Sequence, residues 1–245
     1  MIPKIIHYAW LGPKRMPYRV RRCVKSFVGL HPDFAIKRWD ASNFDFSACQ
    51  YAKDAYDAKK WAFAADYLRL KVLYMFGGIW LDTDMKLLKR LDPLLKYKGF
   101  FATEQEHFVS AGIIGAEKGH PLIGTLLKIY EEKPFVLSEH LEDETIVKII
   151  TDVFIKQGWF DAVSGESHLP NGFELLPGQL FYPPRKRGGF AVTKDTYTIH
   201  YGMGSWLIPK ERMKQKLING CLVLLGPQQT EKLVRIKNGW KKHEQ

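Results

Sequence analysis

Two aspartates separated by one residue, Asp82 and Asp84, are the side chains of this sequence whose spacing best suits chemistry. In an extended chain, residues two apart point to the same side, so both carboxylates can face one point. Hard divalent cations such as Mn²⁺ or Mg²⁺ take such oxygen ligands and keep other positions for water and substrate phosphate. A D-x-D triplet alone is a weak signal, because a chain of this length and charge carries about one by chance.

The apolar segment directly before the pair, Ile79-Trp80-Leu81, makes the signal more specific. It is typical of a buried strand, and open α/β sheets bind ligands where such strands end. A solvated turn would also explain two aspartates, but a buried strand leading into them favours a site. The sequence therefore predicts a metal site at Asp82 and Asp84.

A second pair of charged residues, Asp66 and Arg69, falls three residues apart on the helix expected before this strand, so the two side chains are neighbours. A surface ion pair at these positions would contribute little. A partly buried pair at the sheet edge would instead hold hydroxyls and phosphate of a ligand, since buried charges need partners. The sequence alone leaves both interpretations open.

The elements that must position these residues follow an order typical of a parallel α/β sheet. The predicted strands cover residues 5–10, 34–39, 79–82, 99–104, 108–116 and 196–201. The predicted helices cover residues 20–27, 60–76, 121–131 and 142–157. Gly77-Gly78 is expected to end the second helix, and the glycine- and proline-rich segment 164–189 is expected to form loops.

Length and composition are those of one globular domain: 245 residues, 46% hydrophobic and 26% charged, with no repeat or low-complexity linker. No segment approaches the roughly 20 apolar residues of a membrane span, and the first residues lack signal-peptide features, so an intracellular protein is expected. The three cysteines Cys23, Cys49 and Cys221 are far apart and odd in number. This pattern argues against a disulfide framework and a structural zinc site.

The net charge is +11, and the excess is concentrated late in the chain. Residues 210–245 hold nine Lys or Arg against three Glu. A basic surface attracts polyanions. Docking on an anionic membrane and a merely solvated basic face both remain open for this segment. The basic run at 185–187 is likewise open between a substrate-binding loop and a solvated turn.

Three blocks of the sequence resemble one family. Residues 65–84 resemble the D-x-x-R…G-G-x-(aromatic)-x-D-x-D core of glycosyltransferase family 32, which includes yeast initiating mannosyltransferases and bacterial capsule enzymes. They are also similar to the glucosyltransferase domains of the large clostridial toxins. The opening residues 2–12 resemble the first strand of these families, and His200 with Gly204-Ser205-Trp206 is similar to their closing H…S-W element. The blocks occur in the family's order, although the middle of the chain matches weakly.

This resemblance implies a single GT-A domain over residues 1–245, an α/β fold with a mostly parallel central sheet. Residues 1–115 would bind the nucleotide sugar and the metal, and residues 116–245 would form a loop-rich acceptor side with a basic C-terminal tail. The implied reaction moves a hexose from a nucleotide-diphosphate sugar to a saccharide or lipid-linked saccharide acceptor, with Mn²⁺ or Mg²⁺ and retention of configuration, as in bacterial surface polysaccharide synthesis. A cytoplasmic enzyme is implied, with peripheral contact to an anionic membrane at its inner face and no nucleic-acid partner.

The resemblance also implies roles on the donor side of the site. Trp10, beside Ala9, would stack on the nucleotide base, since every base has a π-face; Trp10 as plain core is the alternative. Asp66 would bind ribose or sugar hydroxyls, and Arg69 would meet donor oxygens. The aromatic residue before the D-x-D is usually Tyr, and Trp80 stands here, so a phenol hydroxyl is missing and donor preference can differ.

Further implied roles concern the metal and the diphosphate. Asp82 would contact the sugar and metal-bound water, and Asp84 would ligate the metal directly. His200 would complete the metal shell or be structural. Ser205 and Trp206 would hold the β-phosphate. A further departure is Ser110, where relatives often carry Asn before Ala, which weakens any role for that position.

The implied chemistry is stabilisation of a departing nucleoside diphosphate, by the cation and by Arg69, with Asp66 and Asp82 as the other catalytic residues. No carboxylate nucleophile is identifiable in the sequence, which favours attack of the acceptor hydroxyl on the same face, with a diphosphate oxygen taking its proton. Two rival functions stay open. A phosphatase of the haloacid dehalogenase type also uses D-x-D, but near the N-terminus, and a basic non-enzymatic nucleic-acid-binding protein would suit the charge, although no binding motif is evident.

Overall fold

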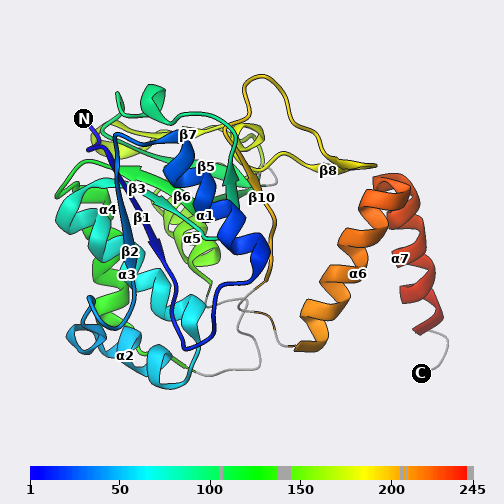
Figure 1. Cartoon of the computed structure of the whole chain (residues 1–245), viewed down its shortest axis with the longest axis horizontal. Helices are drawn as coiled ribbons and strands as arrows, with labels where there is room; N and C mark the ends of the chain where they lie inside the picture. Colours follow the sequence, from blue (N-terminus) through cyan, green and yellow to red (C-terminus); the bar gives the residue numbers. More distant parts are fainter. Residues whose placement is uncertain (105–106, 137–144, 205–206, 208, 242–245) are drawn as a thin grey trace.

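The centre of the molecule is a six-stranded sheet with the strand order β2-β1-β3-β6-β5-β7 (Figure 1). The computed structural model describes residues 1–104, 107–136, 145–204, 207 and 209–241. The strands of this sheet are β1 (Ile5–Ala9), β2 (Ala35–Trp39), β3 (Gly78–Leu81), β5 (Gly99–Glu104), β6 (Phe108–Ala116) and β7 (Phe173–Leu176). Strand β1 pairs in parallel with β2 and β3, and β5 with β7, whereas β6 runs antiparallel to both its neighbours. The predicted fold class, α/β around a mostly parallel central sheet, is confirmed.

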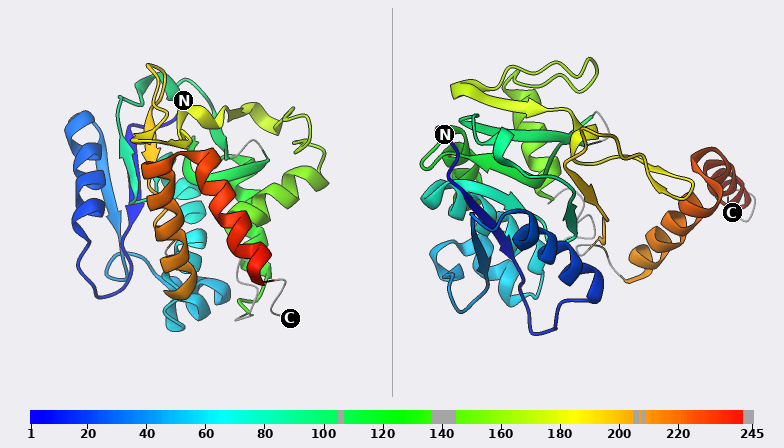
Figure 2. Two further views of the ribbon diagram at one scale, coloured as in Figure 1. Left: turned by 90° about the vertical axis from the view of Figure 1, so that its right-hand side faces the viewer. Right: turned by 45° about the horizontal axis from the view of Figure 1, so that its top comes forward.

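Helices cover both faces of this sheet (Figure 2). They are α1 (Tyr18–Leu30), α2 (Gln50–Asp57), α3 (Trp61–Phe76), α4 (Pro121–Glu132) and α5 (Ile146–Lys156). One hydrophobic cluster joins α2 to α5 with one face of the sheet, and a second joins α1 with the other face. Neighbouring strand residues alternate between the two clusters, as Trp80 does against Ile79 and Leu81, because successive side chains of a strand point to opposite faces.

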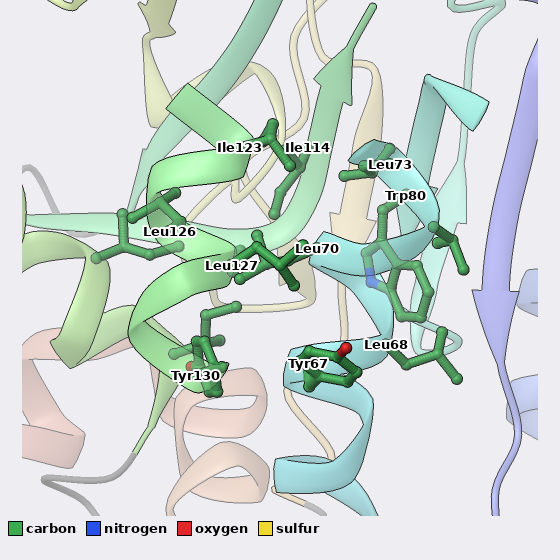
Figure 3. Packing of buried hydrophobic residues seen from close by; sticks show 14 of the residues in the cluster. Tyr67, Leu68, Leu70, Leu73, Trp80, Ile114, Ile123, Leu126, Leu127 and Tyr130 are labelled. Atoms are coloured by element: carbon green, nitrogen blue, oxygen red, sulfur yellow. The ribbon is translucent and has the colours of Figure 1, made fainter. Parts of the chain in front are cut away.

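Helix α3 is the best-buried helix of the described chain, and this burial matters for the site. Its residues Leu68, Leu70 and Leu73 are fully buried. Figure 3 shows Leu70 meeting Leu127 of α4, with Trp80 of β3 on the other side of α3. Because α4 and the sheet enclose α3 from both sides, polar residues on this helix are enclosed as well.

The turn from α3 into β3 depends on two glycines. Gly77 ends the helix with φ 66°, and Gly78 follows with φ 106°, both in the region that favours glycine. A Cβ on Gly78 would come within 2.7 Å of the Ile5 carbonyl oxygen. The glycine pair therefore lets β3 run directly beside β1 after the helix, and this fixes where β3 ends.

Two small sheets complete the body. Strand β4 (Met85–Leu87) pairs antiparallel with β10 (Thr198–His200), and β8 (Arg185–Lys186) pairs with β9 (Gly189–Phe190). The chain then forms two helices that the sequence pattern missed, α6 (Pro209–Leu225) and α7 (Pro227–Lys241). The expected basic tail is thus a helical hairpin within the residues described. No helix in the described part of the chain has the length and apolarity to cross a bilayer.

Candidate metal-binding site

Two distant segments bring the predicted metal ligands together. Strand β3 ends at Leu81, and the Asp82 backbone N–H donates to the Gly112 carbonyl at 2.8 Å, so β6 holds the turn that carries both aspartates. Strand β4 then pairs with β10 so that Met85 lies opposite His200. Ligand atoms of Asp82, Asp84 and His200 consequently lie within 4.8 Å of one another. The structure thus assembles all three residues predicted at the metal.

The charges of this cluster fit a divalent cation. His200 Nε2 lies 3.2 Å from Asp84 Oδ1, and Asp84 Oδ2 accepts a hydrogen bond from the Met203 N–H at 2.8 Å. Burial lowers the pKa of His200, but the negative charges of Asp84, Glu104 and Asp82 outweigh it and raise that pKa to about 9. The carboxylates around His200 therefore create a position that stabilises positive charge. Two carboxylates with one imidazole form a donor set that suits Mn²⁺, which accepts both ligand types.

The pair Asp66–Arg69 is buried, so of the two interpretations that the sequence left open, a surface ion pair is wrong and a buried pair is correct. Arg69 is 6% exposed and Asp66 4%. One guanidinium nitrogen, Arg69 Nη2, lies 3.0 Å from Asp66 Oδ1 and 3.4 Å from Asp82 Oδ1. The other, Nη1, donates to the Ala111 carbonyl oxygen at 2.5 Å. Arg69 therefore ties helix α3 to the D-x-D turn and to β6, rather than forming a surface ion pair.

Burial also changes the protonation of this pair. It raises the pKa of Asp66 to about 7, although the charge of Arg69 acts in the opposite direction. Desolvation likewise raises the pKa of Asp82, against the same guanidinium. The positive charge of Arg69 therefore favours the ionised form of Asp82 but does not fully offset the effect of burial on its pKa.

Trp80 acts on Asp82 from the buried side. Its indole N–H donates to Asp82 Oδ1 at 2.9 Å, and the Arg69 guanidinium lies 5.2 Å from its ring centroid. The side chain is only 1% exposed. Trp80 is therefore too deeply buried to contact a donor directly. It would act on a donor only through Asp82, which it orients.

Trp10 and Ala9 lie at the same edge of the sheet as the aspartates. Strands β1 and β3 pair with Ile6 opposite Ile79, and continuing this register places Ala9 level with Asp82. Trp10 is half-buried rather than core, and its indole N–H donates to the Lys14 carbonyl oxygen at 2.7 Å. It lines a cavity of about 350 Å³ together with Lys14, Arg21 and Arg38. Base stacking by Trp10 stays a prediction, whereas a position in the plain core is wrong.

Two side chains at the cluster escaped the sequence interpretation. The Tyr182 hydroxyl accepts a hydrogen bond from the Ile113 N–H at 3.1 Å, and its ring meets His200 edge-on with centroids 5.5 Å apart. Glu104 accepts a hydrogen bond from the Ser110 hydroxyl at 3.0 Å. Tyr182 comes from the glycine- and proline-rich segment, where no local pattern marks a site residue. The predicted phosphate ligands Ser205 and Trp206 lie outside the described residues.

Gly112 leaves room beside the free oxygen of Asp82. A Cβ at this position would stand 2.9 Å from the Tyr182 hydroxyl and 3.5 Å from Asp82 Oδ2. Asp82 Oδ1 is already engaged by Trp80 and Arg69. The arrangement therefore holds one oxygen of Asp82 in place and leaves space next to the other.

Comparison with known proteins gives a family match over part of the chain. Residues 17–101 match the family described as the glycosyltransferase sugar-binding region containing a DXD motif. The chain is 32% identical over 167 residues to inositol phosphoceramide mannosyltransferase 3 of Schizosaccharomyces pombe, covering 64% of this chain and 45% of that protein. It is 25% identical over 200 residues to mannosyl phosphorylinositol ceramide synthase CSH1 of Saccharomyces cerevisiae, covering 80% and 52%. The chain thus spans about half the length of these curated relatives.

Human lactosylceramide 4-alpha-galactosyltransferase is also similar, with 27% identity over 120 residues, which cover 49% of this chain and 32% of that protein. Among solved structures, PaToxG glycosyltransferase superposes with a TM-score of 0.49 at 18% identity, over 64% of this chain and 69% of that one. The matched family segment contains Asp66, Arg69, Asp82 and Asp84. The predicted D-x-D sugar-binding region is therefore confirmed.

Proposed function

We propose that this chain, whose residues 17–101 match a glycosyltransferase sugar-binding region with a D-x-D motif, transfers a hexose from a nucleotide-diphosphate sugar to a saccharide acceptor. The observation that carries this proposal is the convergence of Asp82, Asp84 and His200 beside the buried Arg69. Asp82, Asp84 and His200 would hold a cation near the carboxyl end of β3, where α/β sheets bind ligands and where it would neutralise charge on a donor diphosphate.

The proposed metal is Mn²⁺ or Mg²⁺, held by Asp84, His200 and Asp82. The ion supplies charge neutralisation to the departing nucleoside diphosphate when it is bound. Mn²⁺ is the better match, because imidazole is a poor ligand for Mg²⁺. The Met203 N–H fixes the second oxygen of Asp84, so that carboxylate is oriented before any ligand binds.

Arg69 acts in this proposal through position and charge. It keeps Asp82 oriented, and the charge of this nearly buried guanidinium favours the ionised carboxylate. Asp66 in turn holds Arg69. We assign sugar hydroxyls to the free oxygen of Asp82 and the base to Trp10, on the strength of their place along one sheet edge.

The proposed stereochemical outcome is retention, by attack of the acceptor hydroxyl on the face that the diphosphate leaves. The proton of that hydroxyl passes to a diphosphate oxygen as the new glycosidic bond forms. The acceptor we propose is the sugar headgroup of a glycolipid or lipid-linked saccharide, because the named relatives act on ceramide lipids. Synthesis of surface polysaccharide is the proposed setting.

A donor screen tests the proposal. Purified protein is incubated with Mn²⁺ and a panel of nucleotide sugars, with and without glycolipid headgroup analogues, and released nucleoside diphosphate is measured. We expect one donor to be consumed, with a loss of about 10²-fold or more in Asp84→Ala. Asp57→Ala, an exposed carboxylate paired with Lys53, is the matched control and should keep full activity.

Other outcomes of the screen would contradict the proposal. Equal release by Asp84→Ala would place the chemistry elsewhere. Phosphatase activity that needs no nucleotide sugar would favour the haloacid dehalogenase type, and steeply salt-dependent DNA binding without turnover would favour a nucleic-acid-binding protein. Proton NMR of the product gives the anomeric configuration, and an inverted product would overturn the same-face mechanism alone.

A further inference from the structure

The hairpin of α6 and α7 stands apart from the α/β body, and the candidate site does not explain it (Figures 1 and 2). Helix α6 contacts β8 and α7, and the Gly188 N–H donates to the Val223 carbonyl oxygen at 2.8 Å. Helix α6 is about 25 Å long, from its 17 residues and the usual rise of a helix. A long helix held away from the core presents a large surface to its surroundings.

One face of α6 is apolar and exposed. Met213, Leu217 and Leu224 are 63%, 64% and 71% exposed. At 100° per residue they fall within an arc of about 40°, so they form one stripe along the helix. Ile218 and Leu222 are half-buried and lie on the far side of the helix, so the stripe is not the face that packs within the hairpin. A single exposed leucine is ordinary, but three large side chains in a row mark a surface that binds something apolar.

Lysines flank this stripe on both sides. Lys216 lies about 60° from one edge, and Lys210 and Lys214 lie within about 60° of the other. The hairpin as a whole, residues 209–241, has eight Lys or Arg and two Glu. An apolar stripe bordered by lysines has the chemistry of a helix that lies in a membrane interface, because lysine stems reach along apolar surface while the ammonium groups stay near phosphate.

We propose that this face of α6 docks on an anionic lipid bilayer, with Met213, Leu217 and Leu224 in the headgroup–acyl boundary and the flanking lysines at lipid phosphates. A second copy of the chain is a poorer occupant. A twofold contact through the stripe places the lysines of one copy near those of the other, and like charges repel. Nucleic acid is also a poorer occupant, since it would leave the apolar stripe in water.

Helix α6 is connected to the candidate site by direct contacts on a side of the helix other than the stripe. Arg212 of α6 donates to the carbonyl oxygens of Gly204 at 3.0 Å and Leu207 at 2.9 Å. Met203, next to Gly204, donates to Asp84. Helix α6 is therefore tied to the segment that leads into the metal cluster through Arg212, which lies about 100° around the helix from the nearer edge of the stripe. The docking itself does not depend on the proposed transferase activity.

Vesicle co-sedimentation of the full chain tests the proposal. Phosphatidylcholine vesicles containing phosphatidylglycerol are compared with pure phosphatidylcholine, and we expect binding to the anionic vesicles only. The stripe variant Met213→Ser/Leu217→Ser/Leu224→Ser should bind more than about ten-fold more weakly, since each side chain loses its apolar burial. Changing Lys210, Lys214 and Lys216 to Gln should weaken binding by about five-fold per lysine, and salt should do the same to the wild type.

The matched control replaces three exposed apolar residues of the body, Val28→Ser/Ile155→Ser/Val163→Ser, which are 54%, 47% and 94% exposed. It should bind like the wild type. Circular dichroism and donor turnover in detergent-free buffer verify that both triple variants are folded. Equal binding by the wild type and the stripe variant would overturn the proposal. So would a wild type that dimerises through the stripe, shown by light scattering, and ignores vesicles.

Discussion

At the scale of single residues, the position of Asp82 depends on two groups from the protein interior. Asp82 Oδ1 receives two donors, the Trp80 indole N–H and the Arg69 guanidinium, and both come from the buried side of the sheet. Such supporting contacts hold a metal ligand in one rotamer, and their removal usually costs ten- to hundred-fold in metal affinity or activity, an order-of-magnitude figure. The indole N–H of Trp80 therefore helps to set the position of Asp82.

This support is tested by Trp80→Phe, which removes the N–H and keeps an aromatic ring in the core. We expect metal affinity and turnover to fall by about ten-fold or more, together with a loss of about 1–3 kcal/mol in the free energy of unfolding from the smaller ring. The matched control is Trp159→Phe, a partly buried tryptophan that packs on Phe154. It should lose similar stability without a change in metal affinity, and a similar affinity loss in both variants would contradict the role assigned to Trp80.

Residue-level prediction from the sequence succeeded where the pattern was local. The spacing of Asp82 and Asp84 after an apolar strand was sufficient to predict a shared site, and the Asp66–Arg69 pairing followed from helix geometry. Whether that pair is buried is a tertiary property, since it depends on α4 and the sheet enclosing α3. Tyr182 could not be found at all, because its loop carries no periodicity and reaches the site only through the fold.

At the scale of elements, β1 is tied into the sheet by a buried histidine. His7 is fully buried; its Nε2 lies 2.8 Å from the Gly77 carbonyl oxygen, and its Nδ1 accepts from the Trp39 indole N–H at 3.0 Å. This arrangement needs the neutral ring with its proton on Nε2, since a proton on Nδ1 would oppose the Trp39 donor. Burial accordingly lowers the pKa of His7 to about 4.

The pH dependence of stability follows from this lowered pKa. Between pH 4 and 6.5 the unfolded chain binds a proton at His7 and the folded chain does not, so the contribution of His7 is complete above pH 6.5 and is lost as pH falls towards 4. The loss amounts to about 3 kcal/mol. The raised pKa of Asp66 makes stability change with pH in the opposite direction. The contribution of His7 is therefore measured as the difference in unfolding free energy between the wild type and a His7 variant.

Urea denaturation of the wild type and His7→Asn between pH 4 and 8 measures this difference. The wild type should be the more stable protein at pH 8, and its advantage should shrink by about 3 kcal/mol on acidification to pH 4. His168→Asn, at an exposed histidine, should keep a constant difference from the wild type. A constant difference for His7→Asn as well would show that His7 is not held neutral.

Helices and strands were predicted well where the sequence pattern that defines them is local, and poorly where they depend on contacts between distant segments. The expected helix 60–76 and the strand that follows it agree closely with α3 and β3, because a long apolar helix and a glycine pair leave few alternatives. The pairing of β4 with β10 joins segments far apart in the chain, so only the family resemblance placed His200 near the aspartates. Helices α6 and α7 were missed because α6 has apolar residues both on an inner face and on the exposed stripe, which hides a simple amphipathic pattern.

At the scale of the whole molecule, the two parts expected as donor side and acceptor side both supply the metal cluster. Asp82 and Asp84 come from the first part, and His200 comes from the second. The division at residue 115 therefore remains a proposal about substrates rather than about the metal. A cation bound there joins β3 and β4 to β10, so its binding energy stabilises the long-range arrangement of the chain and not one loop.

This linkage predicts that metal raises the thermal stability of the whole protein. A ligand that binds only the folded state at 100 times its dissociation constant adds about 2.7 kcal/mol, which corresponds to a rise of about 5–10 °C in Tm for a chain of this size. Differential scanning calorimetry with and without Mn²⁺ measures it. His200→Ala should lose most of the rise, because it removes one of the three ligands and so weakens the affinity for Mn²⁺. His168→Ala, at an exposed histidine outside the cluster, should keep the full rise. An equal Mn²⁺-induced rise in both variants would mean that the ion binds elsewhere.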